Sequence, residues 1–249
     1  ECTSKSADFG VLGSFTENRN ALLITPDGGA LVATPKSKAS DNTFNMTTKV
    51  MLQEDASGKS ESILKTTGLY KETVIDNILD EKKDDQKEYL VNSLGFLQPD
   101  NLELDIDAGN DSAKTSFKLS IEKIPEFSAG NKMFLSPRIY KIWNAQLPSF
   151  ENRTKSFYFQ SPFIKTDTTT YFLPQNYTVE NLPKARDFQC EYGFFNSTYS
   201  YDEKTNSVTS IAYLRLTQNV IPAEKYKETK IFFGKVIGEF SEKIIIKKR

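Results

Sequence analysis

The stretch "LELDIDAGNDSAKTSFKLSIEKI" (residues 102–124) decides the fold class of this chain. In its first part Leu102, Leu104 and Ile106 alternate with acidic residues, and in its second part apolar and polar residues alternate in the same way. Successive side chains of a β-strand point to opposite faces, so a period of two predicts half-buried strands. The same pattern recurs along much of the chain, which predicts a mainly β protein.

Other segments predict a hairpin and helical elements in addition to these strands. The segment "ALLITPDGGALVATP" (21–35) predicts a β-hairpin, because Pro-Asp-Gly-Gly between two apolar runs supplies the backbone of a tight turn. Residues 70–96 have helical spacing around a charged middle, as in one long helix or in two short ones. A further helix is predicted near 222–240, where apolar residues recur at steps of three and four. We therefore expect two β-sandwich-like units, each with a helical element packed against a sheet.

Composition excludes several classes of function. The chain has 249 residues and a net charge of -1, which is not the strongly basic character of a nucleic-acid-binding domain. It has no apolar run of about 18 residues, so no transmembrane segment is expected. Histidine is absent, which removes imidazole-dependent catalysis and the commonest zinc ligand. Cys2 and Cys190 could pair in an oxidising compartment or remain two unpaired thiols.

Three segments resemble one protein family. The segment "ECTSKSADFGVLGSFTENRNALLI" (1–24) is similar to the end of the catalytic core in bacterial exported transglutaminase-like proteins. The segments "YFLPQNYTVENLPKARDF" (171–188) and "IPAEKYKETKIFFGKVIGEFSEKIIIKK" (221–248) resemble the domain of unknown function that closes those proteins. Residues 42–150 resemble that family in the order of their expected strands and helix more than in residue identity.

This resemblance implies that the chain is a fragment of a larger protein and that it divides into three parts. Residues 1–40 would be the remnant of the transglutaminase-like core and a linker, 41–150 a β-sandwich-like domain with a helical insertion, and 151–249 a C-terminal β-sandwich-like domain. The family's core uses a Cys-His-Asp triad, and Glu1 matches its acidic position, whereas Cys2 does not match the nucleophile. The nucleophile and the His would lie upstream, and an acid alone has no imidazole to orient. The family is exported, which implies the periplasm or the cell surface.

Two further segments are candidate sites. The segment "DIDAGND" (105–111) has the alternating oxygen ligands of a calcium loop, but Gly109 and Asn110 depart from the usual order. We interpret it instead as the outer face of a strand that runs into a turn, so no metal is expected there. No other cofactor is expected for the chain. The aromatic-rich segment 190–201 could form a platform for sugars or a peptide, or could pack in a sandwich core. Its candidate binding residues are Tyr192, Phe194, Tyr199 and Tyr201.

The predicted function is a non-catalytic C-terminal accessory region of an exported transglutaminase-like protein. It would scaffold the upstream core of the same protein or bind a protein or glycan partner, and the chain itself is not expected to be an enzyme. The first alternative is a carbohydrate- or peptide-binding β-sandwich module at the cell envelope, which requires a row of exposed aromatic side chains. The second is an enzyme that uses carboxylates alone, which requires a concave pocket with two acids of raised pKa.

Overall fold

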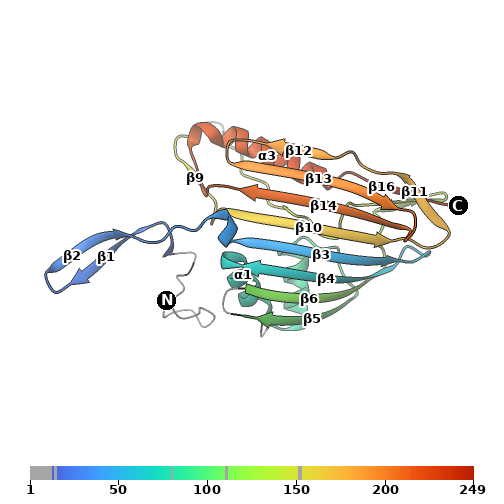
Figure 1. Cartoon of the computed structure of the whole chain (residues 1–249), viewed down its shortest axis with the longest axis horizontal. Coiled ribbons are helices and arrows are strands. Elements are labelled where there is room, and N and C mark those ends of the chain that lie inside the picture. Colours follow the sequence, from blue (N-terminus) through green and yellow to red (C-terminus); the bar gives the residue numbers. More distant parts are fainter. Residues whose placement is uncertain (1–12, 14–15, 80, 110–111, 151–152) are drawn as a thin grey trace.

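The computed structural model of the chain describes residues 13, 16–79, 81–109, 112–150 and 153–249. Its largest element is an eight-stranded sheet (Figure 1). The strands are β3 (Thr43–Leu52), β4 (Gly58–Thr67), β5 (Asn101–Ala108), β6 (Ser112–Ile121), β10 (Phe163–Phe172), β12 (Arg186–Gln189), β13 (Gly193–Asp202) and β14 (Ser207–Leu216). Their order is β12-β13-β14-β10-β3-β4-β6-β5, and every pair is antiparallel except β10 with β3.

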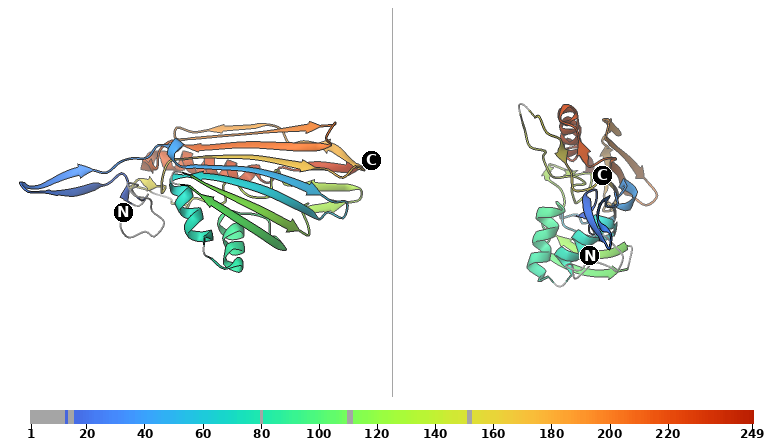
Figure 2. Two further views of the ribbon diagram at one scale, coloured as in Figure 1. Left: turned by 60° about the horizontal axis from the view of Figure 1, so that its bottom comes forward. Right: turned by 90° about the vertical axis from the view of Figure 1, so that its left-hand side faces the viewer.

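A smaller sheet, three α-helices and two short ladders form most of the rest of the described chain. The smaller sheet has the order β11-β16-β8-β7. Its strands are β7 (Phe127–Ala129), β8 (Lys132–Leu135), β11 (Tyr177–Asn181) and β16 (Ile244–Lys248). The helices are α1 (Gly68–Ile78), α2 (Lys83–Glu88) and α3 (Tyr226–Glu239), and they lie on one side of the large sheet (Figure 2). Two short ladders pair β1 (Asn20–Thr25) with β2 (Gly28–Ala33), and β9 (Phe157–Tyr158) with β15 (Val220–Ile221).

The prediction of a mainly β fold is confirmed, but the two expected units share one sheet. Strand β3 from the middle of the chain pairs in parallel with β10 from the C-terminal part, from Thr43–Ile164 to Met51–Phe172. The ladder is therefore continuous across the boundary expected near residue 150. The alternation within each strand could not reveal this, because it does not say which strands become neighbours. The domain limits at 40 and 150 remain predictions.

Two apolar clusters take the place of two separate sandwiches. In the first, Phe44, Leu64 and Phe117 of the large sheet pack with α1 and the smaller sheet. In the second, Phe195 and Leu214 of the large sheet pack with apolar side chains of α3. Both helices bury an apolar stripe against the same face of the sheet, because the strand register puts Leu214 and Phe44 on one face with Lys165 between them.

Local predictions had mixed outcomes. The hairpin at 21–35 is confirmed as β1 and β2, and the helix at 222–240 as α3. The segment 70–96 forms two short helices, of which α2 continues into a π-helical turn at Tyr89–Ser93. The apolar residues Tyr140, Ile142 and Trp143 predict a strand at 140–143, but this prediction is wrong, because Tyr140 makes only an isolated bridge with Phe96.

Candidate functional site

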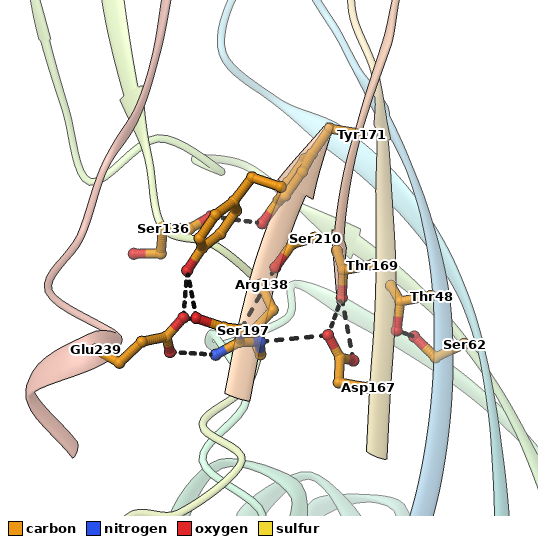
Figure 3. Close-up of polar contacts among 11 residues, drawn as sticks. Thr48, Ser62, Ser136, Arg138, Asp167, Thr169, Tyr171, Ser197, Ser210 and Glu239 are labelled. Atoms are coloured by element: carbon orange, nitrogen blue, oxygen red, sulfur yellow. Dashed lines mark hydrogen bonds and ion pairs between the residues drawn. The ribbon is translucent and has the colours of Figure 1, made fainter. Parts of the chain in front are cut away.

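Three ionisable side chains meet in the interior beneath the large sheet. Arg138 lies between Glu239 and Asp167 (Figure 3). Its Nη1 donates to Glu239 Oε2 at 2.7 Å, its Nη2 to Glu239 Oε1 at 3.2 Å, and its Nε to Asp167 Oδ2 at 3.3 Å. The exposed fraction of all three side chains is 0%. The three residues therefore form a network of ion pairs that solvent does not reach, called the buried triad below.

The members of the buried triad come from three different parts of the fold. Asp167 lies in the middle of β10, and alternation along this strand points it to the same inward face as Phe163 and Tyr171. Glu239 is the last residue of α3, and Arg138 lies in the segment that follows β8. The network therefore connects the sheet, the helix and the segment after β8.

Hydroxyl groups complete the hydrogen bonding of these charges. Ser210 Oγ accepts from Arg138 Nη2 at 3.4 Å, and Thr169 Oγ1 donates to Asp167 Oδ2 at 3.0 Å. The hydroxyl of Tyr199 donates to the Glu239 carboxylate. These partners offset part of the desolvation cost of buried charges.

The two carboxyl groups of the buried triad differ in electrostatics. Burial raises the pKa of Asp167 to about 6, and the opposing attraction of Arg138 does not cancel this. Burial would also raise the pKa of Glu239, but the Arg138 guanidinium and the Tyr199 hydroxyl outweigh it, so this pKa is lowered. Burial alone would lower the pKa of Arg138, yet the Glu239 carboxylate outweighs it and the pKa is raised. Glu239 is therefore the main counter-ion of Arg138.

Two carboxyl groups whose pKa values are driven apart are typical of acid–base catalysis, but this pair has no access to a substrate. Surface clefts lie beside α3 and beside Arg19 and Tyr158, and the described linings of these clefts contain no member of the buried triad. With exposed fractions of 0%, the side chains can hold elements together but cannot contact a solute. The arrangement thus acts structurally.

The side chain of Lys165 lies in a second unusual environment. This residue is two positions before Asp167 and lies on the same face of β10. Its Nζ lies 5.0 Å from the ring centroids of both Phe44 and Tyr70, and 5.5 Å from that of Trp143. No carboxylate of the described residues forms an ion pair with it. Burial lowers the pKa of Lys165 to about 8, and the faces of the aromatic rings are its main electrostatic support.

The four aromatic residues predicted as a binding platform do not share one face. Phe194 lies on the outer face of the sheet against Tyr213, with ring centroids 5.9 Å apart. Tyr199 points inward to Glu239, and Tyr201 points inward to Asn206, whose Oδ1 accepts its hydroxyl at 2.7 Å. Tyr192 is half-buried beside the second apolar cluster. Side chains of one strand alternate between faces, so this segment divides between core and surface.

Other predicted positions fall partly outside the described residues. Glu1 and Cys2 both lie outside them, so the triad acid and the Cys2–Cys190 pairing remain predictions. Cys190 is half-buried, and burial raises the pKa of its thiol. In the segment considered as a calcium loop, Asp105 and Asp107 lie in β5, while residues 110–111 are outside the described residues.

The hairpin β1–β2 is the most exposed apolar element of the described chain. Every one of its strand residues is exposed, and it extends beyond the end of the large sheet (Figure 1). Leu22 is 66% exposed, Ile24 82% and Leu31 71%, and the register puts all three on one face. Leu23 and Val32, 52% and 39% exposed, lie on the other face. The hairpin is therefore apolar on both faces.

In comparisons with known proteins, a family model matches part of the chain. Residues 131–246 match DUF3858, described as a domain of unknown function with a solved structure. This range contains all three members of the buried triad. No curated protein matches the sequence. A crystal structure of a Parabacteroides distasonis protein, described as a candidate protease, aligns with 84% of this chain and 100% of that chain, at 6% identity and a TM-score of 0.33. That likeness is too weak to carry an argument about fold or activity.

Sequence reasoning missed the buried triad, although one signal was present. In "FIKTDTTTYF" (163–172) Lys165 and Asp167 fall in the same phase as Phe163 and Tyr171. Charged residues in the apolar phase of a strand indicate either an exposed strand or buried charges with partners. Nothing in the sequence identifies Arg138 and Glu239 as those partners.

Proposed function

We propose that this chain is a non-catalytic accessory region of an exported transglutaminase-like protein, and that hairpin β1–β2 holds the domain preceding it in the same polypeptide. The observation that carries the proposal is the exposed hairpin that is apolar on both faces. An isolated two-stranded hairpin is marginally stable in water. Strands that are apolar on both faces are typical of sheets covered on both sides. The hairpin therefore has the properties of an element that a partner covers.

The resemblance to the transglutaminase-like family favours the preceding domain as that partner. The segment that resembles the end of the catalytic core, residues 1–24, contains most of β1 (Asn20–Thr25). A domain attached at this point would be tethered beside the hairpin, and a short tether gives a high effective concentration. Covering a Leu or Ile side chain stabilises a complex by about 1.5–3 kcal/mol. Leu22, Ile24 and Leu31 together offer enough apolar surface for stable docking.

The residues of the chain support a mechanical role. Without histidine the chain cannot complete an imidazole-dependent triad from its own residues. Its interior carboxylates, Asp167 and Glu239, are enclosed with Arg138 and do not reach a solute. Location in the periplasm or at the cell surface is part of the proposal and rests on the family resemblance. No helix in the described part of the chain has the length and apolar content needed to cross a bilayer.

A binding experiment tests this role. The polypeptide encoded directly upstream of Glu1 is expressed separately and titrated with the 249-residue chain by calorimetry. The triple variant Leu22→Ser, Ile24→Ser, Leu31→Ser should bind roughly 100-fold more weakly or worse, since each 1.4 kcal/mol is a factor of ten. The matched control is Ile211→Ser, which changes an apolar residue of β14 that is 46% exposed and should leave the affinity unchanged.

Three outcomes would contradict the proposal in different ways. Unchanged affinity of the triple variant would exclude the hairpin as the docking element. An upstream coding region that lacks a transglutaminase-like Cys and His would exclude the accessory role. Acyl transfer to or from a glutamine substrate by the purified chain would show that it is catalytic.

A further inference from the structure

A cleft beside helix α3 concentrates positive charge. It has a volume of about 750 Å³ and lies between the first half of α3 and residues that precede β9. Its described lining contains three cations and no carboxylate. The side chains that give it its character are Phe150, Arg153, Tyr226, Lys227, Lys230 and Ile231.

Arg153 is held in place by aromatic rings. Its guanidinium carbon lies 4.6 Å from the ring centroid of Tyr226, 4.8 Å from that of Phe150 and 5.2 Å from that of Phe157. Its Nη2 donates to the Ser156 carbonyl at 2.9 Å. Tyr226 is itself only 3% exposed, and its hydroxyl donates to the Pro148 carbonyl at 2.6 Å. The guanidinium is therefore positioned before any ligand arrives, which lowers the entropy cost of binding.

The three cations of the cleft are not engaged in ion pairs with described residues. Neither Arg153 nor Lys227 nor Lys230 forms an ion pair there. By contrast Lys225, close by in sequence, pairs with Glu191 at 2.6 Å. The chain as a whole has a net charge of -1, so the excess of positive charge among the described lining residues is local. Such a cleft attracts anions, and a guanidinium binds a carboxylate or phosphate through two parallel hydrogen bonds.

A second cleft, which shares Lys227 and Ile231 with the first, lacks this property. Its volume is about 390 Å³, and its lining includes Glu224 and Glu228 beside Lys227 and Lys235. Charges of both signs there compensate one another. The comparison shows that an excess of cations is not a general feature of the surface around α3.

We propose that the Arg153 cleft binds a small organic oxyanion, namely a carboxylate or phosphate carried on an apolar or aromatic body. The oxyanion pairs with Arg153 and the two lysines. The apolar body covers Phe150 and Ile231, each of which is 52% exposed. A volume of this size suits a small molecule, and apolar walls with a few polar anchors are typical of such sites. The proposal does not depend on the hairpin or on the accessory role.

Simple probes test the proposed chemistry on the full 249-residue chain. The probes are 2-naphthoate, 2-naphthyl phosphate, the neutral 2-naphthamide and inorganic phosphate, each titrated by calorimetry at low salt. At least one naphthyl anion should bind with a Kd of roughly 1 mM or tighter, at least about tenfold tighter than 2-naphthamide. The tighter of the two anions identifies the source of the oxyanion as carboxylate or phosphate. Inorganic phosphate should bind more weakly than naphthyl phosphate because it lacks the apolar body.

Variants locate the binding in the cleft. Arg153→Met should weaken the better anion about tenfold or more. Because Arg153 also packs against three rings, the charge-reversal variant Lys227→Glu, Lys230→Glu provides a second test that leaves this packing intact. The control is Lys235→Gln, on the same helix but lining only the other cleft, and it should bind like the parent. Equal binding of naphthamide and naphthoate, no binding of either anion, or full affinity in the charge-reversal variant would overturn the proposal.

Discussion

Replacing Glu239 with Gln tests whether the buried triad contributes to stability as its burial indicates. Glu239 Oε2 lies 2.7 Å from Arg138 Nη1, and both side chains are 0% exposed. Glutamine keeps the size of the side chain but removes its charge. Arg138 would then depend on Asp167, whose carboxylate is farther away at 3.3 Å and whose pKa is raised to about 6 by burial.

The magnitude follows from the cost of a buried charge that loses its partner. Removing one member of a buried ion pair costs about 3–5 kcal/mol. Asp167 supplies part of the compensation, so we expect the low end, about 3 kcal/mol. In a protein of this size 1 kcal/mol changes the melting temperature by roughly 2–4 °C, so the variant should melt about 6–12 °C lower.

The assay is denaturant unfolding at pH 7, supported by thermal melting. The matched control is Glu191→Gln, because Glu191 pairs with Lys225 at 2.6 Å but its side chain is 46% exposed. Its unfolding midpoint should not change measurably, since solvent screens exposed pairs. Arg138→Met should be much less harmful in the Glu239→Gln background than in the parent, because the isolated charge is then removed. Equal midpoints for the Glu239 and Glu191 variants, or additive effects of the two triad substitutions, would refute the reasoning.

Two other substitutions test the remaining unusual positions. Lys165→Met should increase the free energy of unfolding at pH 7 by on the order of 2 kcal/mol. Between the folded pKa of about 8 and the unfolded value of 10.5 the unfolded chain binds more protons, so the parent protein gains stability as the pH rises. The stability difference between the Lys165→Met variant and the parent should therefore shrink, which urea unfolding at pH 7 and 9 measures. An equal difference at both pH values would contradict this prediction. Gly193→Ala would put a Cβ 2.6 Å from Phe232 Cε1 and should destabilise the fold by about 1–3 kcal/mol. The control Gly234→Ala meets nothing within 4 Å and should stabilise α3 by about 0.5–1 kcal/mol, so equal melting temperatures for both variants would disprove the packing argument.

Local features of the fold could be predicted from the sequence because their causes are local. The hairpin turn lies where Pro26 and Asp27 separate two apolar runs, and Thr25 Oγ1 donates to the Gly28 carbonyl at 2.8 Å. The polar segment "DEKTNS" (202–207) predicts a hairpin turn, and the turn between β13 and β14 lies there, where Asp202 Oδ1 accepts from the Lys204 amide at 2.9 Å. In both cases residues a few positions apart determine the backbone.

Contacts between distant residues could not be predicted in this way. Thr166 of β10 donates to Asn45 of β3 at 2.8 Å although the two are 121 positions apart. The pairing of these strands depends on which surfaces bury the most apolar area together, and periodicity within each strand does not encode it. The same limit applies to the candidate site, since Arg138 and Glu239 meet only after the sheet and α3 have packed.

The buried triad lies where the two apolar clusters meet. Along β10, Tyr171 belongs to the first cluster and Phe163 to the second, with Asp167 between them. Along β14, Val208 belongs to the first cluster and Ala212 to the second. The boundary between clusters therefore crosses a continuous sheet, and charges occupy it.

Charges at this boundary restrict how the two parts of the sheet can pair. If β10 shifted by one residue, Asp167 would turn to the outer face and Arg138 would lose one of its two carboxylates. An apolar residue at the same position would also turn outward in such a shift, but it would not leave a buried charge without its partner. The buried triad thus favours one register between β10 and its neighbours, because the alternative registers leave a buried guanidinium incompletely paired. This preference holds even where the net contribution of the triad to stability is small.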